Sequence, residues 1–307
     1  MTPIVLQLLV HGRADTLPAL FDSLLAQTDK VWKLMLLVNG ATPLMRKEIL
    51  HVLNQYDARL AIDVSHSEEN LGFAGGHQKL FETHQAPYVL LVNDDVVLAP
   101  EYIEQLRTYL DVHPQVAAVS GVLVRPDGRV DSLGLLLHAN GKVSNISEGE
   151  IDSSQMSEPF EVFGVAGTLP LLRCDAVVDA SHDGRLFDPA FGSYKEDIEL
   201  AFRLRLTGWK SVIVPAAMAV HHRTFRRSRL HRHVSFYAQA HSYRNHWWNL
   251  LAFYSMRDYL RHAWALVPFE FAKFAFLCLT HPRILPWTVS TTASHWQELM
   301  RKRRHFL

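Results

Sequence analysis

Short runs of consecutive apolar residues alternate, over the first 124 residues, with segments in which apolar residues recur at helical spacing. An apolar run bounded by Pro, Gly, Asn or Asp is typical of a strand buried on both faces. The pattern predicts strands over 4–10, 31–38, 60–64, 88–92 and 116–124, and helices over 14–27, 43–56, 73–84 and 100–111. This alternation indicates an α/β fold in which a mostly parallel sheet has helices on both faces.

The regular alternation stops after residue 124. Residues 125–159 are rich in Gly, Ser, Asn and Asp and predict hairpins and loops, and apolar alternation returns over 160–173. A helix is expected up to residue 206, ended by Gly208, because glycine commonly follows the last helical residue. A strand over 211–214 then continues as an apolar run to residue 220.

Length and cysteine content restrict the class of protein. A chain of 307 residues accommodates one large domain, or a domain with an appendage. Two cysteines, Cys174 and Cys278, provide no disulfide framework and fit a reducing compartment. The opening Met-Thr-Pro lacks the basic start of a signal peptide, so a cytoplasmic location is expected.

The net charge of zero conceals an asymmetry. Residues 221–307 contain 14 Lys and Arg but only 3 Asp and Glu, whereas residues 1–220 contain 17 and 28. Five of the seven Trp also lie in this basic tail. Basic residues beside Trp are typical of a segment that meets a membrane interface or another anionic surface.

Two adjacent carboxylates follow the predicted strand 88–92. Ligands of open α/β sheets bind outside the carboxyl ends of the strands, so Asp94 and Asp95 lie where a ligand is expected. Adjacent acids repel each other, and a divalent cation held by their oxygens would remove this repulsion. The alternative is an Asn-Asp turn, starting at Asn93, that ends the strand in solvent.

Two further pairs of polar residues follow. Glu196 and Asp197 occupy the first turn of a predicted helix, where acids also interact favourably with the helix dipole. His221 and His222 end the apolar run that begins at residue 211. Each pair alone has a structural explanation, but an acidic strand end, an acidic helix start and a histidine after a strand rarely occur in this order by chance.

Four segments of the chain resemble, in order, the motifs of the family 2 inverting glycosyltransferases, which have the GT-A fold. Residues 70–76, Asn-Leu-Gly-Phe-Ala-Gly-Gly, are similar to a glycine-rich loop of the family, and residues 91–95, Leu-Val-Asn-Asp-Asp, to its strand-end DXD-type motif. Residues 187–208 contain Phe-Asp, Tyr-Lys-Glu-Asp-Ile-Glu-Leu, an Arg and a Gly at the family's positions, and residues 214–222 resemble its Val-Pro-x-Ala…His ending. The resemblance covers about residues 3–225 and is closest to rhamnosyltransferase-like and galactofuranosyltransferase-like members.

The resemblance implies a role for each motif. Asp95, with Asp94 or Asn93, would hold Mg²⁺ or Mn²⁺, and His221 would be the ligand from the other side. Asp197 would take the proton of the acceptor hydroxyl, and Glu196 would orient this base or the acceptor. Residues that would contact the nucleotide-sugar donor are Gly72, Phe73, Gly75 and Gly76, through close backbone approach, and His11 and Asn39 beside the base and ribose.

One departure from the family concerns the donor. The family usually has an Asp after the second strand, in Val-Asp-Asn-x-Ser, whereas here the sequence is Val38-Asn39-Gly40-Ala41. That acid commonly contacts the nucleobase, so the sequence leaves the nucleobase open. The metal and base positions are unaffected.

The tail predicts helices with an interfacial role. A helix is expected over 234–266, and the apolar segment 263–279 is interrupted by Glu270 and Lys273, so it falls short of the ~20 apolar residues of a spanning helix. The basic residues 301–304 would each add about 1 kcal/mol at an anionic leaflet. The basic run 223–233 is a candidate clamp for a diphosphate. The alternative is a helical bundle packed against the catalytic domain or a second subunit.

Together these features predict a catalytic domain over 1–225, with a donor half (1–122) and an acceptor half (123–225), and a helical extension over 226–307. The expected activity is metal-dependent inverting transfer of a sugar from a nucleotide diphosphate to a cell-surface or lipid-linked glycan, at the inner face of the cytoplasmic membrane. No nucleic-acid partner is expected. The alternatives are a sugar-phosphate nucleotidyltransferase, which the sparse Gly and basic content of residues 10–16 disfavours, and a non-catalytic membrane-surface protein.

Overall fold

The computed structural model describes residues 4–146, 156–223 and 235–307. Its first half contains β1 (Ile4–Val10), α1 (Leu17–Leu25), β2 (Trp32–Asn39), α2 (Pro43–Tyr56), β3 (Ile62–Ser67), α3 (Gly72–Phe81), β4 (Tyr88–Val92), β5 (Val96–Leu98), α4 (Tyr102–Val112) and β6 (Val116–Val124). The second half contains β7 (Val130–Ser132), β8 (Leu135–Leu137), β9 (Val143–Asn145), β10 (Phe160–Val162), β11 (Leu171–Arg173), α5 (Cys174–Asp179), the short 3₁₀ helix η2 (Pro189–Phe191), α6 (Glu196–Leu206) and β12 (Lys210–His221). Four helices follow: α7 (Phe236–Phe253), α8 (Met256–Thr280), α9 (Ile284–Ser294) and α10 (Trp296–Phe306).

The strands form one large sheet in the order β10-β12-β6-β11-β4-β1-β2-β3, with β5 beside β12 and β7 beside β6. The pairs β1–β2, β1–β4, β2–β3 and β6–β12 are parallel, which confirms the predicted α/β fold. The short strand β11 lies antiparallel between β4 and β6, a pairing that the sequence pattern did not predict.

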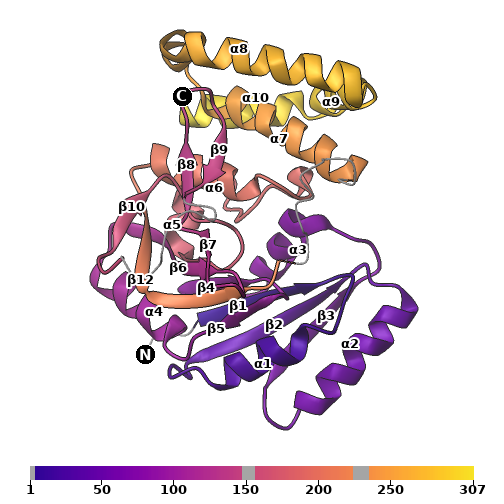
Figure 1. Ribbon diagram of the computed structural model, residues 1–307, viewed down its shortest axis with the longest axis vertical. Helices are drawn as coiled ribbons and strands as arrows, with labels where there is room; N and C mark the ends of the chain where they lie inside the picture. Colours follow the sequence, from indigo (N-terminus) through magenta and orange to yellow (C-terminus); the bar gives the residue numbers. More distant parts are fainter. Residues whose placement is uncertain (1–3, 147–155, 224–234) are drawn as a thin grey trace.

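Both faces of the sheet are covered by helices, because successive side chains of a strand point to opposite faces. In β1, Ile4, Leu6 and Leu8 join a core with α1, α2 and α4, whereas Val5 packs in a second cluster with Leu80 of α3. Figure 1 shows α1 and α2 on one side of the sheet, and α3 on the other side together with the four C-terminal helices.

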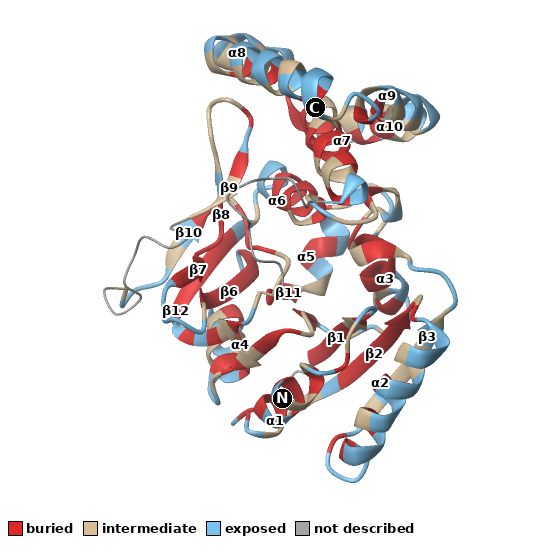
Figure 2. Ribbon diagram, turned by 45° about the vertical axis from the view of Figure 1, so that its right-hand side comes forward, coloured by how far each residue is buried: buried red, intermediate tan, exposed pale blue. Residues whose placement is uncertain are grey.

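The C-terminal helices share a core with the sheet domain. Trp248 of α7 and Leu299 of α10 are buried in the same apolar cluster as Leu200 and Leu204 of α6. Figure 2 shows that α7 is largely buried while α8 on the outside is largely exposed. The bundle alternative from the sequence thus describes α7 and α10, which pack against the sheet domain.

The helix expected over 234–266 is wrong in its boundaries. α7 ends at Phe253, and α8 starts after Ser255, whose hydroxyl accepts from the Asp258 N–H while the Asp258 carboxylate accepts from the Ser255 N–H. This capping box starts a new helix. α8 then continues through Pro268 for 25 residues, so it is longer than expected. By length and composition, α8 alone among the helices of the described chain could cross a membrane, and 17% of its apolar window is buried.

Candidate active site

Strand pairing brings together the two principal metal-ligand candidates. β5 follows Asp95 directly and pairs antiparallel with the end of β12, with His221 opposite Val96. The His222 N–H donates to the Asp95 carbonyl over 2.8 Å. As a result, Nε2 of His221 lies 3.2 Å from Oδ1 of Asp95. The structure thus brings these two groups, 126 positions apart in the sequence, into contact.

A third acidic residue at this site escaped the sequence analysis. Asp131, in β7, is buried and its Oδ2 accepts a hydrogen bond from Nδ1 of His221 over 2.8 Å. Its Oδ1 lies 3.1 Å from Nε of Arg125 and 2.6 Å from Nε of Arg223. Such a carboxylate on the far nitrogen of a histidine fixes the orientation of a metal-binding ring. The available signal was one Asp, between Val130 and Ser132, in a segment predicted as hairpin and loop.

The charges of the site follow from this arrangement. Burial raises the pKa of Asp131, but the hydrogen bond to His221 and the charge of Arg223 outweigh it and lower that pKa to about 2. Burial lowers the pKa of His221, but hydrogen bonds to Asp131 and Asp95 raise it to about 8. Burial and then the charge of Asp95 raise the pKa of Asp94 to about 6. Because Asp94 and Asp95 repel and His221 faces Asp95, these donors fit a divalent cation.

The predicted base lies at the start of α6. Oδ2 of Asp197 accepts from the Gly167 N–H over 3.1 Å, and burial raises its pKa, which makes it a stronger base. Burial, and then the charge of Asp197, raise the pKa of Glu196 well above its ordinary value. Oε2 of Glu196 is buried and has no hydrogen-bond partner within the described chain. A buried carboxylate oxygen without a partner is a site for a ligand or water.

Residues 167 and 168 connect this base to the end of β4. The Gly167 N–H binds Asp197, and the next carbonyl, that of Thr168, accepts from the Asn93 N–H over 3.1 Å. A side chain at Gly167 would contact the ring of Phe73 at 3.4 Å, so Phe73 lies against the same segment. The structure therefore gathers Asn93, Asp197 and Phe73 around one short connection.

The predicted base-and-ribose residues form a network with a third residue. Nδ1 of His11 donates to the Asn39 carbonyl over 2.7 Å, and Nε2 of His11 lies 3.2 Å from the Asn70 amide nitrogen. The Asn39 side chain is buried, donates to the Gly72 carbonyl and accepts from the Leu71 N–H. His11 is exposed, with both ring nitrogens engaged, whereas the side chain of Asn39 anchors the turn into α3.

The close backbone approach predicted for Gly72–Gly76 needs correction at its start, because residues 72–74 begin helix α3 and their N–H groups are engaged. The N–H of Gly72 donates to Asn70, that of Phe73 to the Ser193 hydroxyl and that of Ala74 to the Gly192 carbonyl. Gly72 has φ +70°, and a Cβ there would lie 2.3 Å from the Gly192 oxygen. Gly76 likewise has Leu9 2.7 Å from an added Cβ, and Gly75 is buried, so the glycines allow close packing of α3.

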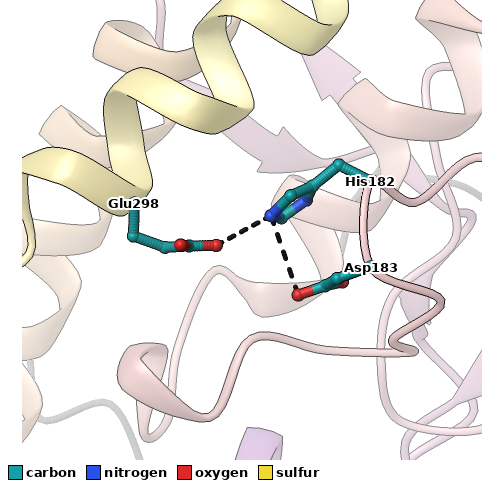
Figure 3. A group of neighbouring side chains, drawn as sticks. All are labelled: His182, Asp183 and Glu298. Carbon is teal, nitrogen blue, oxygen red and sulfur yellow. Dashed lines mark hydrogen bonds and ion pairs between the residues drawn. The ribbon is translucent and has the colours of Figure 1, made fainter.

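The basic run 223–233 lies outside the described residues except for Arg223, which pairs with Asp131. Within the described chain, the group of three potential metal-ligand side chains whose ligand atoms all lie within 4.8 Å of one another is outside the predicted site and consists of His182, Asp183 and Glu298 (Figure 3). Nε2 of His182 lies 2.7 Å from Glu298 of α10. Two arginines, Arg185 and Arg301, already pair with its carboxylates, so this group links α10 to the loop after α5.

Comparison with known proteins identifies the fold and the family. GalNAc-T7, solved with UDP, GalNAc and Mn²⁺, matches with TM-score 0.62 and 12% identity over 82% of this chain and 48% of that chain. The mannosyltransferase PcManGT from Pyrobaculum calidifontis, solved with GDP-Man and Mn²⁺, matches with TM-score 0.54 and 14% identity over 96% of this chain and 75% of that chain. The chain thus spans about half the length of GalNAc-T7. No curated protein matches the sequence.

The fold is the GT-A fold of the two solved glycosyltransferases described above. The model of the family described as "Glycosyltransferase like family 2" matches residues 13–247, and the chain therefore belongs to this family. The motif resemblance ends at about residue 225, whereas the family match extends further, into α7. The family predicted from the sequence is confirmed.

Proposed function

We propose that this enzyme is a metal-dependent inverting glycosyltransferase that moves a sugar from a nucleotide diphosphate to a hydroxyl of a cell-surface polysaccharide or lipid-linked glycan. The observation that carries the proposal is the contact between Asp95 and His221, oriented by Asp131. Both solved relatives described above hold Mn²⁺ together with a nucleotide or nucleotide sugar.

Each residue has a defined part in this proposal. Asp95, Asp94 and His221 would hold Mg²⁺ or Mn²⁺, which when bound neutralises the charge of the leaving diphosphate. Asp197 takes the proton of the acceptor hydroxyl, which attacks the anomeric carbon opposite the leaving group, so the configuration inverts. Glu196, with its buried oxygen, orients the acceptor or the base.

The donor is proposed at the level of a nucleotide sugar, with rhamnosyl and galactofuranosyl donors suggested by the subgroup resemblance. UDP and GDP-Man are the nucleotides bound by the two relatives. The exposed ring of His11 and the nearby end of β2 would border the base. Because the chain has Asn39 where the family usually has Asp, the nucleobase of the donor has to be determined by measuring binding to a panel of nucleotides.

We propose that α8 holds the enzyme at the inner face of the cytoplasmic membrane. Exposed apolar side chains form one stripe along α8, spaced three or four residues apart: Met256, Leu260, Trp264, Val267, Phe271 and Phe274. A groove of ≈ 640 Å³ opens beside it, lined by aromatic and aliphatic side chains of all four C-terminal helices that include Tyr243, Trp247, Phe274, Val289 and Trp296. An apolar stripe and groove of this kind suit the hydrocarbon chains of a lipid surface.

The test uses matched variants with a panel of nucleotide sugars and Mn²⁺. Asp197→Asn is expected to lower kcat by about 10²- to 10⁴-fold and to keep the thermal stabilisation given by the nucleotide with Mn²⁺. Asp95→Asn is expected to abolish that Mn²⁺-dependent stabilisation, and Asp57→Asn, on the exposed end of α2, to change neither. NMR of the product anomer checks inversion. Full activity of Asp197→Asn, or a product of retained configuration, contradicts the proposal.

A further inference from the structure

The turn that leads into α6 has an unusual backbone. Tyr194 and Lys195 have φ of 74° and 67°, and neither is a glycine. A non-glycine residue is strained in this left-handed region, so two in succession persist only where the surrounding structure holds them. Lys195 immediately precedes Glu196 and Asp197, so the direction in which α6 starts depends on this turn.

One side chain of α7 binds this turn from the outside. Asn245 is fully buried, and its Nδ2 is within hydrogen-bond distance of three main-chain carbonyls, those of Phe191 (2.9 Å), Ser193 (3.2 Å) and Tyr194 (2.7 Å). One helical turn later, Nδ2 of Asn249 donates to the Lys195 carbonyl over 3.2 Å. Residues four positions apart share a helix face, so one face of α7 binds the carbonyls of residues 191 and 193–195.

The Asn245 amide is itself held in one orientation. Nε of Arg244 donates to Oδ1 of Asn245 over 2.9 Å, which leaves the NH₂ group to face the carbonyls. The guanidinium of Arg244 lies 4.2 Å from the ring centre of Trp248 and 5.0 Å from that of Trp287, so cation–π contacts fix it in turn.

The other side of the same turn contacts the start of α3. The Ser193 hydroxyl accepts from the Phe73 N–H, and the Gly192 carbonyl accepts from the Ala74 N–H. The turn is thus fixed between α3, next to the predicted donor side, and α7. On the α7 side, the Asn245 side chain contacts the carbonyl of Tyr194, a residue in the left-handed conformation, together with the carbonyls of Phe191 and Ser193.

We infer that Asn245 is a positioning residue of the transfer reaction: it holds the left-handed turn that aims Asp197 and Glu196. The inference rests on the proposed function of Asp197 as base. Asn245 acts through the backbone of residues 191–194 and touches no reacting atom.

Asn245→Asp tests this role, because it keeps the size of the side chain and replaces the NH₂ donors by oxygen. The kcat is expected to fall about 10- to 100-fold, as for a base displaced by a fraction of an ångström to 1 Å. The donor KM and the stabilisation by UDP or GDP with Mn²⁺ are expected to stay near those of the wild type. Asn54→Asp, the same change on the exposed face of α2, should leave kcat unchanged.

A double-mutant cycle separates positioning from general destabilisation. Tyr194→Gly lets the turn adopt the left-handed conformation without the side-chain penalty, so the loss caused by Asn245→Asp should be smaller in the Tyr194→Gly background. An equal loss in both backgrounds, or a parallel change of kcat and KM, would overturn the positioning role.

Hydrogen exchange measures the effect on the turn independently of enzymatic activity. In Asn245→Asp the amides of residues 190–200 are expected to exchange faster while those of β1 and β2 stay protected. Unchanged exchange over 190–200 overturns this inference alone. A wild-type chain that transfers sugar from no donor, with faster exchange in the variant, overturns the proposed function and leaves the structural role of Asn245 in place.

Discussion

At the residue scale, the centre of the site is a row of groups that alternate in charge: Arg223 and Arg125, then Asp131, His221 and Asp95. Asp131 has a pKa near 2 and stays ionised, so it is the fixed negative charge behind the ring. His221, with a pKa near 8, carries the exchangeable proton. A cation that binds Asp95 and the neutral ring has to displace this one proton.

The first prediction concerns pH. The pKa of His221 lies above its ordinary value, so below pH 8 the ring is protonated and metal binding must release that proton. The affinity for Mn²⁺ is therefore expected to rise up to about tenfold per pH unit from pH 6 to 8 and to level off above. Calorimetry in buffers of different ionisation enthalpy should count about one proton released at pH 7. His222→Ala should keep this release, and a pH-independent affinity would contradict the assignment.

The second prediction concerns Asp131. Asp131→Asn removes a hydrogen bond that raises the pKa of His221 and orients its ring, so the affinity for Mn²⁺ should fall about 10- to 100-fold. The midpoint of the pH dependence should also move below pH 8, because one cause of the raised His221 pKa is lost. Asp127→Asn, an exposed change in the adjacent turn, is the matched control. Equal Mn²⁺ affinity in the Asp131 and Asp127 variants would show that Asp131 plays no part in metal binding.

The sequence reveals some of these residues and conceals others for a physical reason. Asp95, Asp197 and His221 stand next to predicted strands and helices, so their positions at the sheet edge follow from local pattern. Asp131 reaches His221 only because β7 pairs with β6, and Asn245 reaches the turn before α6 only because of how α7 packs. Both depend on tertiary register, which periodicity does not contain.

At the element scale, two charged side chains of α8 face the protein and its exposed stripe is apolar. Glu270 points inward, where it lies 2.6 Å from His246 of α7, and Lys273 lies over the ring of Tyr243. The two charges that interrupt the apolar segment in the sequence therefore face the protein. The basic residues of α10 show the same division. Lys302 and Arg303 bind Asp188 and main-chain carbonyls, whereas Arg301, which pairs with Glu298, and Arg304 are exposed.

The third prediction tests α8 as a membrane-binding element. Phe271 is 71% exposed in the centre of the stripe, so Phe271→Glu should lower partitioning onto vesicles of phosphatidylglycerol and phosphatidylcholine by at least about tenfold. Leu44→Glu, at a residue 70% exposed on α2, should have no effect. Flotation of the purified protein with vesicles measures both. If the two variants float alike, α8 is not the contact.

At the scale of the whole molecule, a basic residue of the tail pairs with buried acidic residues of the sheet domain. Lys302 of α10 is 3% exposed, and its ammonium lies 2.6 Å from Asp188 and 3.0 Å from Glu199. Glu199 also pairs with Arg203 of α6, over 2.8 Å. Part of the charge asymmetry along the sequence is thus an intramolecular match, and the element that carries the predicted base is held from both α7 and α10.

The fourth prediction follows from this burial. Lys302→Met leaves Asp188 and Glu199 buried with one cation fewer, and breaking a buried pair in this way costs about 3–5 kcal/mol of unfolding free energy. Arg301→Met, at the exposed neighbour, should change it by about 0.5 kcal/mol or less. Denaturant unfolding followed by Trp fluorescence measures both, and because five Trp lie in the tail it also reports whether tail and sheet unfold together. Since α7 and α10 share the core of α6, one cooperative transition is expected; a separate early transition, or equal stability of the two variants, would show that the tail is an independent appendage.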